Sequence, residues 1–177
     1  MRTAGEPTPG SPAAASPDAD PEAIARAILL RRLTMAPRTE AELREDLRSR
    51  GVPPEVAERV LARFVEVGLI NDAEYAHMWT QSRHRSKGDA RTVIRQQLRR
   101  KGVDDDLIES ALEGVSVQAE QDRARALVEA RIPSMLRLEP EVRARRLTAM
   151  LQRRGYPAGM AYGVVRDVLG ERASESG

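Results

Sequence analysis

The chain has 177 residues, of which 29 are basic, 27 are acidic and none is cysteine. This length suits one ordinary domain or a few small units. The lack of cysteine excludes disulfides, thiolate metal ligands and a cysteine nucleophile. No apolar run approaches the roughly 20 residues that cross a membrane, and no signal-peptide core follows the N-terminus. A soluble, cytoplasmic protein is therefore expected.

The first 21 residues are rich in proline and alanine and contain no Ile, Leu, Val or aromatic residue. Such a segment buries too little apolar surface to offset the entropy of ordering it. Residues 1–21 are therefore predicted to be a disordered tail, and residues 171–177 a disordered C-terminal end. Without residues 1–21 the chain has 28 basic and 24 acidic residues, a net charge of +4.

The remaining sequence predicts an all-α protein. Aromatic residues, which strands favour, make up only 3% of the chain, whereas Leu, Val, Ala and Met suit packed helices. Helices are expected at 23–35, 72–85 and 120–132, with Asp72 as the N-cap of the second. Residues 39–42, Thr-Glu-Ala-Glu, form a capping box that opens a further helix.

Three glycines, Gly51, Gly102 and Gly155, anchor an internal repeat. A leucine or isoleucine lies eight and four residues before each glycine, and a base lies directly before it. Apolar residues follow at five, nine, ten and thirteen positions after it. The pattern predicts a helix with one apolar face, a left-handed glycine that ends it, and a second amphipathic helix.

Residues that suit a helix N-terminus follow each glycine: Pro53-Pro54, Asp104 and Pro157. With the helix that precedes each pair, the chain is predicted to hold nine helices in three tandem three-helix repeats. A unit of about 45 residues has little core of its own, so neighbouring repeats are expected to stack into an elongated or curved array. The predicted bounds of the repeats are 22–70, 71–115 and 116–170.

No catalytic constellation is evident in the sequence. Lys87-Gly88-Asp89 lacks the Gly-Lys-Ser/Thr ending of a phosphate-binding loop. His77 and His84 are seven residues apart without a carboxylate at metal-ligand spacing, and no nucleophile motif accompanies them. The chain is therefore predicted not to be an enzyme and to need no cofactor or metal.

The strongest functional signal is positive charge. Between Trp79 and Val103 there are eight Lys or Arg residues and one acid, Asp89. Four of these bases are spaced by four and are expected to form a line along one helix: Lys87, Arg91, Arg95 and Arg99. A second basic cluster occupies the matching helix of the third repeat: Arg143, Arg145, Arg146, Arg153 and Arg154.

Such a line predicts a surface for a negatively charged partner, because few acids are present to pair with it. The residues predicted to contact a partner or nucleic acid are Lys87, Arg91, Arg95, Arg99, Arg100, Lys101, Arg153 and Arg154. A solvated helix face is the plainer interpretation, and a GC-rich genome alone would favour arginine over lysine. Trp79, the sole tryptophan, is expected to be a core anchor rather than a partner contact.

Three segments of this sequence resemble the RecX family of bacterial recombination regulators: TEAELREDLRSRGVP, GLINDAEYAHMW and SRHRSKGDARTVIRQQLRRKGV. The resemblance covers about residues 24–170. Two positions depart from the family pattern: Asp89 stands where proline usually follows the glycine, and Gln97 stands where glutamate is usual.

The resemblance implies three tandem three-helix repeats and a non-enzymatic modulator of RecA. Members of the family bind along the groove of the RecA–DNA filament and restrain its ATPase, strand-exchange and coprotease activities. Some members also contact DNA, so the expected partners are the RecA filament and single- or double-stranded DNA. The chain is expected to act as a monomer without a membrane partner.

Two alternatives remain open from the sequence. A helix-turn-helix protein that binds DNA without RecA also uses two helices joined by a tight turn. A structural helical adaptor with no nucleic-acid partner would not depend on the basic line.

Overall fold

The computed structural model describes residues 20–175 of the chain. The predicted tail at 1–21 lies outside the described residues except for its last two. Asp20 is the N-cap of the first helix, because the Asp20 carboxylate accepts a hydrogen bond from the amide of Glu22, and Pro21 is the first residue of that helix. Proline suits this position, where its missing amide proton has no helical partner.

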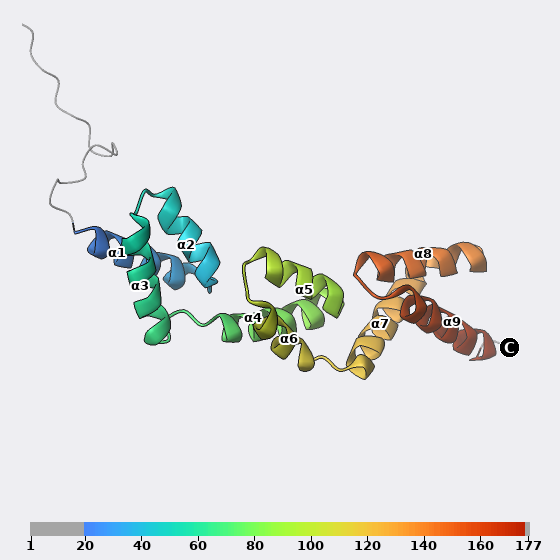
Figure 1. The fold of residues 1–177 in the computed structure, drawn as a ribbon. Helices are drawn as coiled ribbons and strands as arrows, with labels where there is room; N and C mark the ends of the chain where they lie inside the picture. Colours follow the sequence, from blue (N-terminus) through green and yellow to red (C-terminus); the bar gives the residue numbers. More distant parts are fainter. Residues whose placement is uncertain (1–19, 176–177) are drawn as a thin grey trace, which may run out of the picture. The chain divides into compact units, whose positions relative to one another are not determined.

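The described residues form nine α-helices and no strand (Figure 1). The helices are α1 (Pro21–Met35), α2 (Glu40–Ser49), α3 (Pro54–Glu66), α4 (Asp72–Ser82), α5 (Arg91–Arg100), α6 (Asp105–Glu113), α7 (Val117–Arg131), α8 (Pro140–Arg153) and α9 (Ala158–Glu175). A π-helical turn, η2 (Arg83–Lys87), follows α4, and a 3-10 turn, η3 (Ile132–Met135), follows α7. The predicted all-α fold is confirmed; the elongated array stays a prediction.

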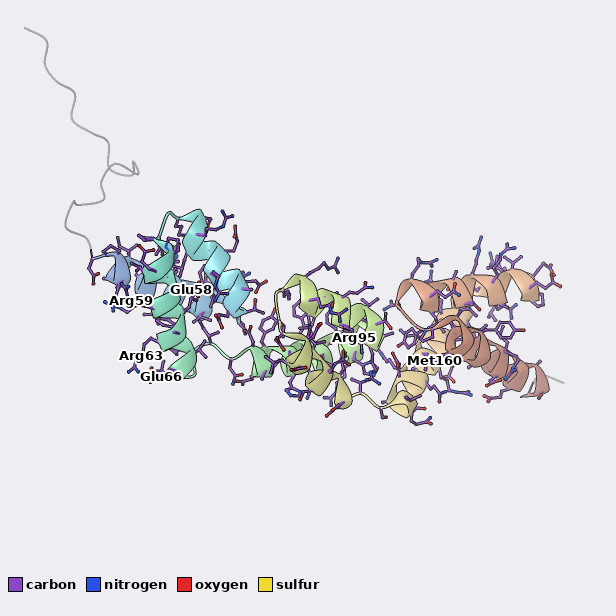
Figure 2. All side chains as sticks on the ribbon, in the orientation of Figure 1. Glu58, Arg59, Arg63, Glu66, Arg95 and Met160 are labelled. Carbon is purple, nitrogen blue, oxygen red and sulfur yellow. The ribbon has the colours of Figure 1, made fainter. Side chains whose placement is uncertain are left out.

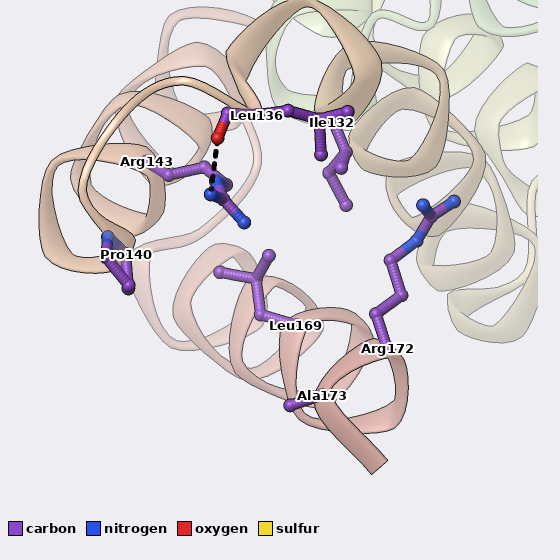
Figure 3. Close-up of a pocket in the computed structure, with 7 residues that line it drawn as sticks. All are labelled: Ile132, Leu136, Pro140, Arg143, Leu169, Arg172 and Ala173. Atoms are coloured by element: carbon purple, nitrogen blue, oxygen red, sulfur yellow. Dashed lines mark hydrogen bonds between the residues drawn. The ribbon is translucent and has the colours of Figure 1, made fainter. Parts of the chain in front are cut away.

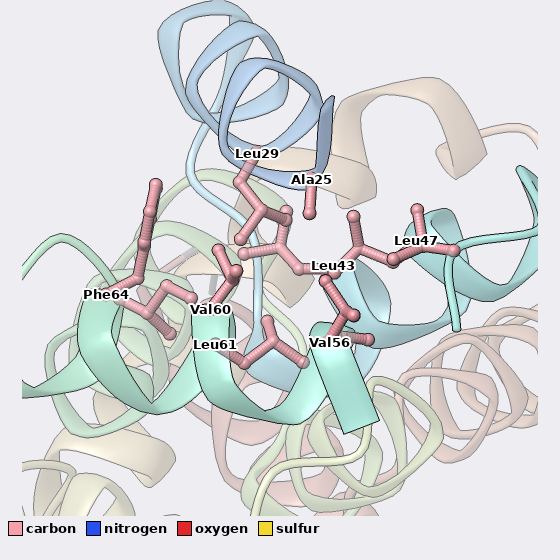
Figure 4. Packing of buried hydrophobic residues seen from close by; sticks show 11 residues of the cluster. Ala25, Leu29, Leu43, Leu47, Val56, Val60, Leu61 and Phe64 are labelled. Atoms are coloured by element: carbon pink, nitrogen blue, oxygen red, sulfur yellow. The ribbon is translucent and has the colours of Figure 1, made fainter. Parts of the chain in front are cut away.

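The chain divides into two compact units. The first contains α1 to α3 and ends at Ile70; the second begins at Asn71 and also includes Thr39–Ala41. In the first unit the three helices pack around fully buried leucines, with Val60 and Phe64 of α3 beside them (Figure 4). Complete burial of a leucine side chain stabilises the fold by about 1.5–3 kcal/mol, so this small core depends on few residues.

The second unit contains two cores, one for each repeat. Tyr75, Ile94, Leu98 and Ile108 are among the buried residues of the first core. The second core is built by α7, α8 and α9, and Ala90, which directly precedes α5, is buried within it. The start of α5 thus belongs to the third repeat's core, which joins the two repeats.

The three predicted glycine turns have the same geometry. Gly51, Gly102 and Gly155 have φ of 74°, 75° and 88°, a left-handed conformation that costs other residues energy. In each turn the amide of the residue directly after the glycine bonds back to the carbonyl of a buried leucine. These bonds run from Val52 to Leu47, from Val103 to Leu98 and from Tyr156 to Leu151 at 3.2 Å each.

Three hydrogen bonds join the second and third repeats at η2 and the start of α5. The amide of Ala90 donates to the carbonyl of Arg154 at 2.9 Å, and the guanidinium of Arg154 donates to the carbonyl of Lys87. The hydroxyl of Tyr156 donates to the carbonyl of Gly88 at 3.2 Å. Burial, and then the charge of Glu120, raise the pKa of Tyr156 to about 12, so the phenol stays protonated at neutral pH.

The carboxylate of Glu120 completes this junction. Glu120 is buried, and its Oε1 accepts a hydrogen bond from the amide of Arg91 at 2.9 Å. Helix α5 has no side-chain cap from its own N-cap residue, Ala90. An acid from α7 therefore caps the first turn of α5 and bonds one of its unpaired amides.

Four details differ from the sequence predictions. The N-cap of α4 is Asn71 rather than Asp72, because the Asn71 side chain accepts from the amide of Glu74 at 3.0 Å. Helix α7 begins at Val117, three residues before the predicted start, with Ser116 as its cap. Residues 171–175, predicted to be disordered, continue α9; residues 176–177 lie outside the described part. Lys87 lies in the π turn rather than in α5.

We predict that Gly155→Ala destabilises the second unit by more than about 1 kcal/mol, because left-handed geometry costs an L-residue roughly this much. A Cβ at this position would also lie 2.5 Å from Cγ2 of Val93. The measurement is chemical denaturation followed by the fluorescence of Trp79, the sole tryptophan, which lies in this unit.

The matched control is Gly163→Ala. Gly163 lies within α9, where a Cβ would meet nothing within 4 Å, and alanine favours a helix over glycine. Its denaturation midpoint should equal or exceed that of the parent chain. Equal midpoints for the two variants would contradict the role assigned to the Gly155 turn.

Candidate anion-binding surface

Helix α5 presents its bases away from the core, as the spacing predicts. Ile94 and Leu98 are completely buried, whereas on the neighbouring face Arg99 is exposed and Arg95 is half-buried. Arg95 is labelled on this helix in Figure 2. Because Lys87 lies in the preceding π turn, the predicted line of four is three arginines on α5 and one lysine before it.

The prediction that these bases are unpaired is wrong for two of them. The guanidinium of Arg95 donates to both carboxylate oxygens of Glu109, at 2.6 and 2.9 Å. Arg99 does the same to Asp105, at 2.7 and 3.2 Å. Both acids belong to α6, beyond the segment in which acids are scarce, and the glycine turn at Gly102 folds α6 back beside α5.

The two pairs perturb the pKa values of their members. The hydrogen bond from Arg95 lowers the pKa of Glu109, and the hydrogen bond from Arg99 lowers that of Asp105. Both carboxylates are therefore charged at neutral pH, and the pairs are intact. Asp105 and Arg99 remain more than half exposed. Exposed pairs of this kind are weak, so a phosphate or carboxylate of a partner competes with them at small cost.

Three of the other predicted contact residues in the second repeat, Lys87, Arg91 and Arg100, make no ion pair among residues 20–175. Arg100 and the side chain of Lys87 are exposed and make no ion pair there. Arg91 is half-buried, and its Nε is buried without a hydrogen-bond partner. These three side chains offer positive charge without first breaking an ion pair.

Lys101 has a different environment. Its ammonium lies over the ring of Trp79, 4.6 Å from the centroid, and 5.5 Å from that of Tyr75. The two rings stack with centroids 5.9 Å apart. A cation over aromatic faces is attracted by their quadrupoles, so Lys101 helps to hold the aromatic pair in place. Trp79 is half-buried and belongs to the edge of the core, as expected.

Gln97 and Asp89 form a polar network with Arg83. The Oε1 of Gln97 accepts from Nε1 of Trp79 at 3.0 Å and from Nε of Arg83 at 2.9 Å. The Nε2 of Gln97 donates to Asp89 at 3.1 Å, and Asp89 pairs with Arg83 at 3.0 Å. The two positions that depart from the family pattern thus contact each other, and Asp89 provides the carboxylate that residue 97 lacks.

The third repeat contains a hollow of about 560 Å³ lined by four arginines. Arg131 ends α7, Arg146 and Arg153 lie on α8, and Arg154 caps α8. Met135, Ala149 and Met150 also line it. Arg153 and Arg154 were predicted as contacts; Arg131 and Arg146 were not. For Arg146 the signal in the sequence is the spacing of 146, 149, 150 and 153, which puts these residues on one face of α8; Arg131, on α7, has no such signal.

A second hollow in this repeat, of about 380 Å³, lies between the start of α8 and the end of α9 (Figure 3). Its lining includes Ile132, Leu136 and Leu169. Arg143 donates to the carbonyls of Leu136 and Leu138 at 3.2 and 3.0 Å, and Arg172 also has a partner within the protein. Both arginines of this groove are therefore already engaged.

The first unit differs because many of its bases pair with acids. Arg44 contacts Glu58 at 2.6 Å, Arg59 contacts Glu22 at 2.9 Å and Arg63 contacts Glu66 at 2.6 Å. Figure 2 shows Glu58, Arg59, Arg63 and Glu66 along α3, which carries both acids and bases. This mixed surface is typical of a solvated helix, so the candidate site lies in the second unit.

The described part of the chain has no group of three or more His, Cys, Asp or Glu side chains arranged to hold a metal ion. His77 is exposed, and His84 is buried with its Nδ1 3.4 Å from the carbonyl of Asp89. Among residues 20–175, no helix combines the length and apolar character that crossing a membrane requires.

Comparison with known proteins decides the family. The first, second and third three-helix domains of RecX match residues 25–64, 71–112 and 118–165. The chain belongs to the RecX family. It is 48% identical over 160 residues to the regulatory protein RecX of Thermobifida fusca, covering 90% of this chain and 86% of the relative. The RecX protein of Streptomyces coelicolor is 46% identical over 160 residues, with 90% and 85% covered.

Solved RecX structures share the fold. The crystal structure of RecX from Lactobacillus salivarius has a TM-score of 0.77 at 20% identity, covering 85% of this chain and 97% of that one. A second RecX crystal structure has a TM-score of 0.73 at 24% identity, covering 84% and 73%. The predicted family and its three tandem three-helix domains are confirmed, and RecX proteins are regulators rather than enzymes.

We predict that Asp105→Asn with Glu109→Gln strengthens binding to heparin, a polyanion. The substitutions release Arg95 and Arg99 from their carboxylate partners, so both guanidinium groups face the ligand unpaired. The measurement is the salt concentration that elutes the full chain from a heparin column.

The matched control is Asp106→Asn with Glu113→Gln. These acids also lie on α6 and are exposed, and neither pairs with a base within residues 20–175. The control changes the net charge equally but releases no arginine from an ion pair. It should therefore raise the elution salt concentration less. The same increase for both variants would show that only total charge matters.

Proposed function

We propose that this protein binds the RecA–DNA filament and restrains its ATPase, strand-exchange and coprotease activities. The observation that carries the proposal is the match of all three RecX domains along one chain, with about 45% identity to RecX regulators over most of it. The protein acts by binding and performs no chemistry. It works in the cytoplasm, as a monomer.

The charge distribution suggests where the filament is contacted. A RecA–DNA filament presents protein carboxylates and DNA phosphates, and the arginine fork suits both. Lys87, Arg91 and Arg100 meet such groups without breaking an ion pair. Arg99 exchanges a weak exposed pair for a new one, and Arg95 exchanges a half-buried pair. Lys101, Arg153 and Arg154 extend the surface on either side of this set.

The stacked aromatic pair and the junction between the second and third repeats hold helix α5 in place. Stacking of Tyr75 on Trp79 and the bonds of Gln97 fix the side of α5 that faces α4. Glu120 and Tyr156 fix its start against the third repeat. The bases of α5 therefore project from a helix held at both its face and its end, which limits the entropy lost on binding.

We predict that Lys87→Gln, Arg91→Gln and Arg100→Gln together raise the concentration needed to inhibit RecA by at least about tenfold. A tenfold loss corresponds to about 1.4 kcal/mol of binding free energy, a modest demand on three charged contacts. The measurement is the single-stranded-DNA-dependent ATPase of the cognate RecA, titrated with parent and variant chains at two salt concentrations.

The matched control removes three arginines from the first unit: Arg48→Gln, Arg59→Gln and Arg63→Gln. Each of them is exposed and pairs with an acid. The control variant should inhibit nearly as well as the parent. If the folded parent chain does not inhibit RecA at any ratio, the RecA assignment is wrong, and a DNA-binding protein that acts without RecA becomes the better account.

A further inference from the structure

The arginine hollow of the third repeat is lined by arginines from two helices, α7 and α8, and by Arg154, which directly follows α8. Arg131 comes from α7, and Arg146 and Arg153 lie two turns apart on α8. No carboxylate is among the residues that line the hollow, and within residues 20–175 these three side chains make no ion pair. One nitrogen of Arg154 donates to the carbonyl of Lys87.

Helix dipoles account for only part of this cluster. Arg131 and Arg153 lie in the last turns of α7 and α8, where the helix end is negative and favours a base. Arg146 lies about two turns before the end of α8, outside the range of that effect. Arg146 lines the same hollow as the other arginines, so like charges share the hollow and no carboxylate of the lining neutralises them. A bound anion would neutralise them.

The apolar residues of the lining indicate which class of anionic ligand the hollow suits. Met135 and Met150 are half-buried in the hollow, and thioethers make favourable contacts with aromatic rings. The volume of about 560 Å³ lies within the range of about 300–1,000 Å³ typical of small-molecule sites. A ligand with both a phosphate and an aromatic ring matches both parts of this lining.

We propose that this hollow binds a nucleotide unit of single-stranded DNA, with the phosphates on the arginines and the base against the methionines. In a duplex the faces of the bases are stacked inside the helix, so the methionines would have no ring to contact. Guanidinium planes also stack on unpaired bases. A single strand therefore uses the whole lining, whereas a duplex uses only its charge.

This inference rests on the DNA-contact part of the proposed function and names its site. It is separate from RecA binding, because the test below contains no RecA. Arg154 links the hollow to the surface of the second repeat through the carbonyl of Lys87. A strand in the hollow would thus continue toward Lys87, whose side chain is exposed.

The test measures binding of the full chain to a labelled oligothymidylate about 20 nucleotides long, longer than a usual single-strand site, by fluorescence anisotropy. Arg146→Gln with Arg153→Gln should weaken binding at least tenfold at low salt. The slope of log affinity against log salt should fall in magnitude by about 1.4, since each lost phosphate contact contributes about 0.7.

The matched control is Arg137→Gln with Arg145→Gln, which removes the same charge from the same repeat. Both side chains are exposed, and neither lines the hollow. The control should keep the salt slope of the parent. Circular dichroism and Trp79 fluorescence establish that both variants are folded, as expected for substitutions of accessible arginines.

Three results would overturn the proposal. Equal weakening by the two double variants would mean that diffuse charge, and not the hollow, binds DNA. If the chain bound a duplex of the same length with equal affinity, the methionines would not contact an unpaired base. Displacement of the oligonucleotide by polyglutamate at equal charge concentration would make the hollow a site for an acidic peptide. The proposed function is tested separately, by the RecA ATPase titration of the Lys87→Gln, Arg91→Gln, Arg100→Gln variant, which leaves the hollow unchanged.

Discussion

The left-handed glycine that ends α2, α5 and α8 is the constraint on which each repeat depends. It lets the chain reverse directly after a helix, so that the amide of the residue after the glycine bonds back to the carbonyl of a completely buried leucine. The next helix then packs its apolar face on the same core. In the third repeat this turn has an additional role. Gly155 leaves room for Val93 of α5, and Arg154 and Tyr156 on either side of it bond to the backbone around Gly88.

Charge is distributed by the same turns. Because the turn at Gly102 folds α6 beside α5, the acids that follow it reach Arg95 and Arg99 and neutralise the middle of the basic line. In the third repeat, by contrast, no acid lines the arginine hollow, so the arginines there have no carboxylate partner in the lining. The first unit pairs bases with acids along α3. The mixed surface of the first unit thus contrasts with the hollow of the third repeat, whose lining contains no acid.

Much of the fold follows from the sequence, because the signals that specify it are local. A glycine four residues after a leucine, followed by a helix-start residue, determines the end of one helix and the start of the next within a few positions. The site was less predictable, because it depends on contacts between helices. Asp105 and Glu109 lie beyond the acid-poor segment, so their pairing with α5 was missed. Arg131 reaches the hollow only because α7 ends beside α8, and the π turn that displaces Lys87 from α5 has no clear sequence signal.

The central claim is that the second unit, through its bases, contacts the RecA–DNA filament. The most direct test is hydrogen–deuterium exchange of the full chain, alone and bound to filaments of the cognate RecA on single-stranded DNA. The account predicts slower exchange in peptides that cover 83–101 and 146–155, and little change along α3. Protection confined to the first unit, with 83–101 unchanged in a chain shown to be bound, would contradict it.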